Sequence, residues 1–261
     1  CVLDLGLIDQ SLLEPGVVNQ ATGRATYGYV TQAIDACLSQ CVHAVTTCPA
    51  NKEALHSAGI PQPGHTEIFA DRTQSKKFCM AFLSDEINCS LVTVHAGYEE
   101  VPHLLNEQRI VDVIELTRKT HKKLLGKEPR IAVCGLNPHA GENGLFGNRE
   151  EELIIQPAMD RMRKEGCDLV GPVPPDTAFT QSQRNMTDAY ICMYHDQALI
   201  PIKTLDFHTS VNLTIGLSFI RTSPDHGTAF DIAGKNLANP TSTIEAIKLA
   251  WNLSKKEQKD Q

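Results

Sequence analysis

The sequence lacks several features that would place it in common functional classes. Its longest apolar runs are about 7 residues, far below the roughly 20 that a membrane-spanning helix requires. The first ten residues contain no basic region ahead of an apolar core, so they do not resemble a signal peptide. No basic block offsets the net charge of −7, which argues against a nucleic-acid partner. We therefore expect a cytoplasmic protein with neither a membrane nor a nucleic acid as partner.

The cysteines also exclude a class of site. The 9 cysteines are an odd number and contain no Cys-x-x-Cys pair, so a zinc-thiolate site is not expected. Several, such as Cys134 in "IAVCGL" and Cys192 in "YICMY", lie in apolar runs. We interpret most of them as small buried hydrophobic residues in a reducing compartment.

Glycine patterning excludes one kind of cofactor site and favours another. The sequence contains no Gly-x-Gly, which argues against a Rossmann-type dinucleotide fingerprint. The segment "DHGTAFDIAGKNLANP", residues 225–240, is dense in glycine and small residues. It predicts a long loop ahead of the last helix, of a kind suited to wrapping a nucleotide.

Short apolar runs alternate with longer amphipathic stretches along most of the chain. The periodicity predicts helices over residues 28–38, 101–125, 150–166 and 241–253, the last capped by Thr241 or Ser242. It predicts strands over residues 41–49, 76–82, 89–94, 130–136, 167–173 and 188–194. This alternation is typical of an α/β fold with a largely parallel sheet.

Three histidines follow predicted strands, directly or after a short turn. They are His95 after "SLVTV", His139 after "RIAVCGLNP" and His195 after "AYICMY". Ligands gather at the carboxyl ends of strands in such folds, so these imidazoles are candidates for one divalent metal site. Asp176 or Asp196 could orient a ligand imidazole. The alternative is three separate strand-end histidines, each hydrogen-bonded to its own loop.

Other residues are candidates for binding an anion. In "PGHTE", residues 63–67, His65 or Thr66 could cap a helix whose first N–H groups bind the anion. Lys203 and Arg221 stand in apolar surroundings, and a cation there needs a partner such as a phosphate or carboxylate. The alternative is a buried stem with an exposed head, or an internal ion pair. The glycine-rich segment 135–144 around His139 indicates a loop that approaches a ligand closely.

Several segments together resemble the 4-hydroxythreonine-4-phosphate dehydrogenase family of pyridoxine (vitamin B6) biosynthesis. They are "TTCPANKEAL", "GHTE", "VTVH", "GLNPHAGENG", "GPVPPDTAF", "YHDQALIPIK", "VNLTIGL" and "IRTSPDHGTAFDIAGK". They occur in the family's order from about residue 45 to residue 235. The segment "GENGLFGNREE" also resembles a paralogous branch that acts on phosphorylated four-carbon sugar acids.

The resemblance implies a two-lobed fold like that of isocitrate and isopropylmalate dehydrogenases, working as a homodimer with a shared active site. The lobes would be a discontinuous cofactor-side lobe, residues 1–62 and 191–261, and a central lobe with the dimer interface, residues 63–190. The family opens with a Gly-Asp-Pro-Ala-Gly-type loop that this sequence lacks. An N-terminal segment is therefore expected to be missing ahead of Cys1.

The resemblance also implies roles for single residues. The metal ligands would be His95, His139 and His195. The substrate-binding residues would be His65, Thr66, Lys203, Asn212 and Arg221. The cofactor-binding residues would be His226, Gly227, Asp231 and Asn239, with Asp231 favouring NAD over NADP. The catalytic candidates are Lys52, Asp176 and Asp196.

The implied activity is a metal-dependent, NAD-linked oxidation with decarboxylation. The substrate would be 4-phosphohydroxy-L-threonine, giving 3-amino-2-oxopropyl phosphate, or a closely related phosphorylated four-carbon hydroxy acid. The metal would be Zn, Co, Mg or Mn. The alternatives are a cofactor-free metal-dependent hydrolase or decarboxylase, and a non-catalytic ligand-binding relative.

Overall fold

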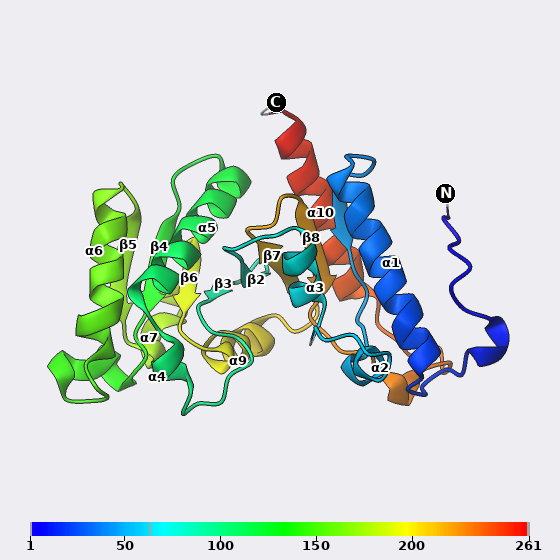
Figure 1. Ribbon diagram of the computed structural model, residues 1–261. Helices are drawn as coiled ribbons and strands as arrows, with labels where there is room; N and C mark the ends of the chain where they lie inside the picture. The colour runs from blue at the N-terminus through cyan, green and yellow to red at the C-terminus, as the bar shows by residue number, and fades with distance from the viewer. Residues whose placement is uncertain (1, 63, 260–261) are drawn as a thin grey trace. The chain divides into compact units, whose positions relative to one another are not determined.

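The computed structural model describes residues 2–62 and 64–259, which form two units (Figure 1). Unit 1 comprises Cys1–Lys76 and Leu217–Gln261, and unit 2 comprises Lys77–Gly216. The boundaries therefore lie at 76/77 and 216/217 instead of the expected 62/63 and 190/191. The strand ladders explain this, because β2 (Cys79–Leu83) pairs with β7 (Val211–Ile215) inside unit 2.

Unit 2 is built on a mostly parallel sheet with the strand order β7-β2-β3-β6-β4-β5. Its other strands are β3 (Asn88–Leu91), β4 (Arg130–Cys134), β5 (Asp168–Val173) and β6 (Ala189–Cys192). Strands β3, β6, β4 and β5 pair in parallel, whereas β2 runs antiparallel to both of its neighbours. The predicted α/β fold with a largely parallel sheet is thus confirmed.

Two long helical segments of unit 2 pack together beside the sheet (Figure 1). The expected helix 101–125 is two helices, α4 (Val101–Leu104) and α5 (Glu107–Leu125). The break occurs because Asn106 caps α5 by accepting the Arg109 N–H, and α5 ends at Gly126 with a φ of 70°. The expected helix 150–166 begins with one π-helical turn, η3 (Glu151–Ile155), and continues as α6 (Gln156–Lys164).

The remaining elements of unit 2 are short or follow strand ends. They are η2 (Pro138–Gly144), α7 (Pro175–Ala178), α8 (Gln181–Arg184) and α9 (His195–Leu205). One core cluster joins strand residues such as Phe82, Leu91 and Tyr190 to Leu199 and Ile202 of α9. Among the described cysteines, all of them free, six are buried and only Cys41 and Cys48 are exposed. The interpretation of most cysteines as buried hydrophobic residues is confirmed.

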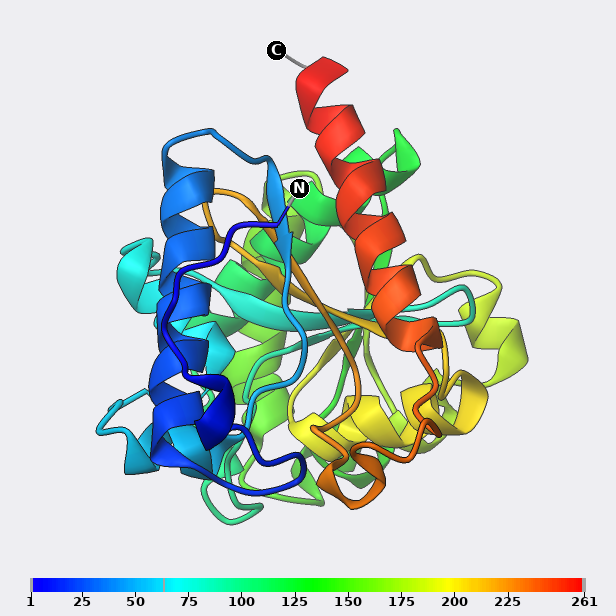
Figure 2. The same ribbon diagram turned by 90° about the vertical axis from the view of Figure 1, so that its right-hand side faces the viewer.

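Unit 1 pairs strand β1 (Ala44–Thr46) in parallel with β8 (Ile220–Pro224). In Figure 2, β1 lies between α1 (Gln20–Leu38) and α10 (Thr241–Lys259). The unit also contains η1 (Gln10–Leu12), α2 (Lys52–Ser57), α3 (His65–Arg72) and η4 (Phe230–Ile232). Its core joins residues such as Ile34, Val45, Leu55 and Phe69.

One helix start and one helix cap in unit 1 differ from the expectation, whereas α10 begins at Thr241 as predicted. Helix α1 begins eight residues earlier than predicted because the Asn19 side chain accepts the Ala21 N–H. Thr241 and Ser242 do not cap α10, because Thr241 is its first residue and donates its N–H to Asn239. No helix in the described part of the chain is both long and apolar enough to cross a bilayer.

Candidate active site

The three strand-end histidines follow strands that are neighbours in the sheet of unit 2. Strand β6 pairs in parallel with β3 on one side and with β4 on the other. Their carboxyl ends therefore open on the same edge of the sheet. His95 follows β3, His195 begins α9 after β6, and His139 lies in η2 after β4.

His95 and His195 come together at this edge. Their ring centroids are 6.0 Å apart, with 38° between the ring planes. The Nδ1 atom of His195 lies 2.7 Å from Oδ1 of Asp196. Hydrogen bonds from His195 and Tyr98 lower the pKa of Asp196, so this carboxylate is ionised and can only accept. Nδ1 of His195 therefore carries the proton, and in the neutral ring Nε2 is left as the lone-pair donor.

Tyr98 was not predicted to have a role at this site. Its hydroxyl donates to Oδ2 of Asp196 at 2.7 Å, and its ring packs edge-on against Tyr194. Both carboxylate oxygens of Asp196 are therefore hydrogen-bonded, Oδ1 to His195 and Oδ2 to Tyr98. The only signal in the sequence is the position of Tyr98 three residues after His95.

His139 lies on a loop with an unusual backbone. Six consecutive residues, 139–144, have positive φ values, and His139 itself is at φ 52°, ψ 28°. Its Nδ1 lies 3.1 Å from Oε2 of Glu142, and its ring packs against Phe146. Across residues 2–62 and 64–259, no three His, Cys, Asp or Glu side chains gather as a metal group. The structure of one chain thus brings together two of the three expected ligands.

Two buried carboxylates hold this loop. Oε1 of Glu151 accepts the backbone N–H groups of Leu136 and Asn137 at 2.8 and 2.7 Å. The Asn137 side chain donates to both Glu150 and Glu151. Burial favours a higher pKa for Glu150, but hydrogen bonds from its own backbone, Asn148 and Asn137 outweigh it and lower the pKa. Non-glycine residues with positive φ cost free energy, and such anchoring is what maintains them.

A cavity of about 450 Å³ is lined by Asp196, the hydrogen-bond partner of His195, but by neither imidazole. The lining includes two of the predicted catalytic residues, Asp176 and Asp196, together with Phe179 and Tyr194. The volume is in the range of small-molecule sites, which is roughly 300–1,000 Å³.

Lys203 and Asn212, also in unit 2, do not line this cavity. Nζ of Lys203 lies 5.3 Å from the ring centroid of Phe207, a cation–π contact. Asn212 lies in β7, where its buried Oδ1 has no hydrogen-bond partner among the described residues. A buried amide oxygen without a partner is rare and indicates a donor that arrives with a ligand or water.

In unit 1, Arg221 is the centre of a cluster that includes Thr47, His65, Glu67 and Phe69. Its side chain is 2% exposed, donates to Thr47 Oγ1 at 2.8 Å and lies over the ring of Phe69. Burial lowers the Arg221 pKa to about 10, and the charge of Glu67 opposes this shift. Burial and then the Arg221 charge lower the pKa of His65 to about 4. At neutral pH, the cluster therefore contains a guanidinium cation and a neutral imidazole.

His65 and Thr66 begin α3, but neither caps it as expected. The N-cap is Gly64, which has no side chain to cap the helix, and His65 and Thr66 are the first two helical residues. Their backbone N–H groups belong to the helix turn that has no intrahelical acceptors, so they can face an anion. Cε of Lys52, at the start of α2, lies 3.7 Å from where a Gly64 side chain would begin.

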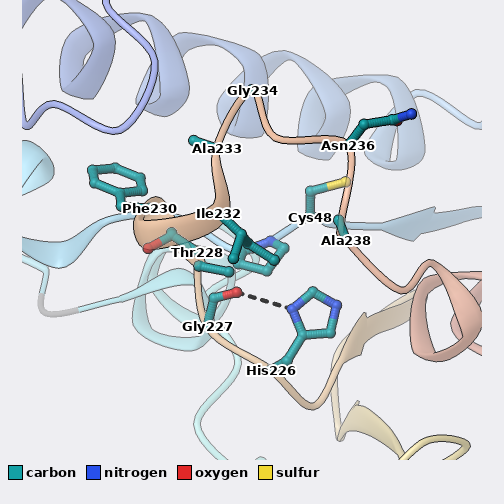
Figure 3. A pocket seen from close by; sticks show the side chains of 12 residues that line it. Cys48, His226, Gly227, Thr228, Phe230, Ile232, Ala233, Gly234, Asn236 and Ala238 are labelled. Atoms are coloured by element: carbon teal, nitrogen blue, oxygen red, sulfur yellow. Dashed lines mark hydrogen bonds between the residues drawn. The ribbon is translucent and has the colours of Figure 1, made fainter.

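The predicted cofactor loop forms one wall of a cavity of about 620 Å³ in unit 1 (Figure 3). His226 and Gly227 line it, with Nδ1 of His226 2.9 Å from the Gly227 carbonyl oxygen. Neither Asp231 nor Asn239 is in the lining. Asp231 is exposed in η4, and the side chain of Asn239 is hydrogen-bonded to Thr241. The lining is rich in glycine, alanine and other small side chains.

The chemistry of the donors can be compared with the expected metal. A pair of imidazoles, one of them with its Nδ1 fixed by a carboxylate, supplies donors that suit a divalent transition metal. His95 and His195 fit this description in the structure. The roles of His95, His139 and His195 as metal ligands stay predictions.

Comparison with known proteins identifies the relatives of this chain. The family described as "Pyridoxal phosphate biosynthetic protein PdxA" matches residues 2–250. The chain is 44% identical over 253 residues to D-threonate 4-phosphate dehydrogenase of Pectobacterium atrosepticum, covering 97% of this chain and 77% of the relative. It is 45% identical over 250 residues to 4-hydroxythreonine-4-phosphate dehydrogenase of Desulforapulum autotrophicum, covering 95% and 73%.

A solved structure shares the fold. The crystal structure of 4-hydroxythreonine-4-phosphate dehydrogenase from Klebsiella pneumoniae matches with a TM-score of 0.85 at 42% identity. The match covers 95% of this chain and 75% of that one. The resemblance inferred from the sequence motifs is confirmed.

Proposed function

The chain belongs to the PdxA family, and from this premise we propose that it oxidises and decarboxylates a phosphorylated four-carbon hydroxy acid in an NAD-linked, metal-dependent reaction. The substrate is 4-phosphohydroxy-L-threonine, giving 3-amino-2-oxopropyl phosphate, or the related D-threonate 4-phosphate for which the Pectobacterium relative is named. The observation that carries the proposal is the His95–His195 pair, whose partner Asp196 also lines a cavity.

In this proposal His95, His139 and His195 would hold a divalent metal. When bound, the metal supplies a Lewis acid that favours loss of the substrate's hydroxyl proton. Asp196 holds His195 in the tautomer that presents Nε2, and Tyr98 holds Asp196.

The reaction is balanced by NAD as the oxidant. The carbinol carbon gives a hydride to NAD and the hydroxyl oxygen gives up a proton, which leaves a ketone β to the carboxylate. The bond to the carboxylate carbon then breaks, CO2 leaves, and the electron pair that remains is protonated on carbon. Asp176 and Lys52 are the proposed proton carriers, and Asp176 is supported by its place in the cavity lining.

Binding of the anionic groups is proposed for Arg221, His65 and Thr66, with Lys203 and Asn212. The support is the buried guanidinium, the neutral imidazole next to it and the N–H groups at the start of α3. A substrate with a phosphate and a carboxylate needs such groups, because each buried anion requires hydrogen-bonded positive partners.

For the cofactor, we propose that the cavity lined by His226 and Gly227 takes the adenosine half of NAD. Asp231 would accept from the ribose 2′-OH, and its charge would repel a 2′-phosphate. Asn239 would lie at the same loop. The proposal includes the two-lobed arrangement of isopropylmalate dehydrogenase and a homodimer with a shared active site.

The test is to incubate the purified chain with NAD, Zn²⁺ and each phosphorylated acid, and to follow NADH absorbance together with the ketone product. Equal amounts of NADH and product are expected, and a chelator should abolish both. Binding without turnover would instead support a ligand-binding relative. Product without NADH would support a cofactor-free hydrolase or decarboxylase.

A further inference from the structure

Gln197 is buried in the first turn of α9, two residues after His195, and is 6% exposed. Its Oε1 accepts the Met193 N–H and its Nε2 donates to the Gly135 carbonyl, both at 2.7 Å. One amide side chain thus joins the end of β6 to the end of β4.

This bridge stands where the two strands stop pairing. The ladder between β4 and β6 ends at Val133 and Ile191. Beyond that point no backbone ladder joins the two strands, and the Gln197 amide links Met193 to Gly135 instead. Only a side chain with both a donor and an acceptor of this reach can do so.

The bridge continues toward His139. A Cβ atom on Gly135 would lie 2.8 Å from Cα of Ala140, so the loop folds back directly onto Gly135. Ala140 is the residue after His139. The position of the Gly135 carbonyl therefore fixes the root of the His139 loop.

The third strand end is joined to the same point. Oγ1 of Thr93, two residues before His95, donates to the Met193 carbonyl at 2.7 Å. Met193 is thus bonded to Thr93 through its carbonyl and to Gln197 through its N–H. A continuous series of hydrogen bonds connects the strand ends that lead to all three histidines.

We propose that Gln197 is a positioning residue that sets the His139 loop relative to His195. The inference rests on the proposed metal site. The side-chain hydrogen bonds of Gln197 go to the backbone of Met193 and Gly135, and Gln197 acts through that backbone. Its loss is expected to weaken metal binding more than it disturbs the fold, since groups that orient ligands typically change metal affinity about 10- to 100-fold.

The experiment uses the metals alone as probes on the full chain. Zn²⁺ affinity is measured by competition with a chelator, and the geometry of the site is followed by the visible absorption of bound Co²⁺. Gln197→Met removes both hydrogen bonds at nearly constant volume. Gln197→Glu keeps the acceptor for Met193 but loses the donor to Gly135. The matched control is Gln181→Met, at an exposed position of unit 2.

Both Gln197 variants are expected to bind Zn²⁺ about 10- to 100-fold more weakly and to change the Co²⁺ spectrum. The control is expected to change neither. If Gln197→Met does not fold, Gln197→Glu tests the proposal by itself. A wild-type Zn²⁺ affinity and Co²⁺ spectrum in Gln197→Glu would overturn the role of the hydrogen bond to Gly135.

The experiment distinguishes a failure of the positioning role of Gln197 from a failure of the proposed metal site. If the wild type binds Zn²⁺ and Gln197→Met binds it within about twofold with the same Co²⁺ spectrum, the positioning role is wrong and the proposed function stands. If the wild type binds neither metal, the proposed metal site is wrong and the role of Gln197 is overturned with it.

Discussion

The lowered pKa of His65 predicts how much the free energy of unfolding depends on pH. Burial and the charge of Arg221 lower this pKa from 6.5 to about 4. As the pH falls below 6.5, the unfolded chain takes up the proton while the folded chain does not. The contribution of the neutral imidazole is therefore complete above pH 6.5 and is lost as the pH falls toward 4. At about 1.4 kcal/mol per pH unit, the full loss is about 3 kcal/mol, of which about 2 kcal/mol is reached by pH 5.

Urea unfolding at pH 7.5 and pH 5 measures this effect. His65→Gln removes the titrating group, so the wild type should lose about 2 kcal/mol more unfolding free energy than the variant between these pH values. Comparing the two proteins cancels the other groups that titrate in this range. His56→Gln, at an exposed position in the same unit, is the matched control and should keep the wild-type pH dependence.

The pKa of His65 should also change when an anion binds at Arg221. Phosphate bound at Arg221 would offset the guanidinium charge and so raise the His65 pKa. An NMR titration of the His65 ring should give a pKa of about 4 without phosphate and a higher value with it. A pKa near 6.5 in the free protein, or equal pH dependence in wild type and His65→Gln, would show that burial beside Arg221 does not lower the His65 pKa.

Three further predictions follow from the loops. His139→Ala should abolish Zn²⁺ binding and turnover but keep the circular dichroism spectrum, and full activity in the variant would remove its role as a ligand. Asp231→Arg should reduce the preference for NAD over NADP in kcat/KM, and unchanged ratios would count against its role. A Cβ on Gly147 would lie 2.3 Å from Asn137 Nδ2, so Gly147→Ala should cost about 2 kcal/mol more unfolding free energy than Gly126→Ala. Gly126 has a similar positive φ but open space around it, and equal costs in urea unfolding would contradict the steric argument.

The sequence predicted the strand ends better than the helices. Apolar runs identify buried strands because both faces of a parallel strand are covered, and the histidines after β3, β4 and β6 could be located from this alone. The strands are in fact adjacent and parallel. Helix α9 was not predicted, since Pro201 lies inside it and proline usually ends a helix.

Short helices and long-range contacts could not be read from the sequence. Helix α2 spans only six residues and depends on the Asn51 side chain accepting the Ala54 N–H. Tyr98 and Asp196 are 98 residues apart, so no local pattern indicates their hydrogen bond. The roles of Gln197 and Glu151 depend on where strand ends meet in space, which periodicity does not describe.

The most direct test of the account is X-ray absorption at the zinc edge on the Zn²⁺-loaded chain. We expect one zinc ion per chain with scattering from three imidazole rings, and no bound zinc in His139→Ala. Zinc bound without imidazole scattering, or an identical spectrum in that variant, would contradict the claim that the three strand-end histidines hold one ion.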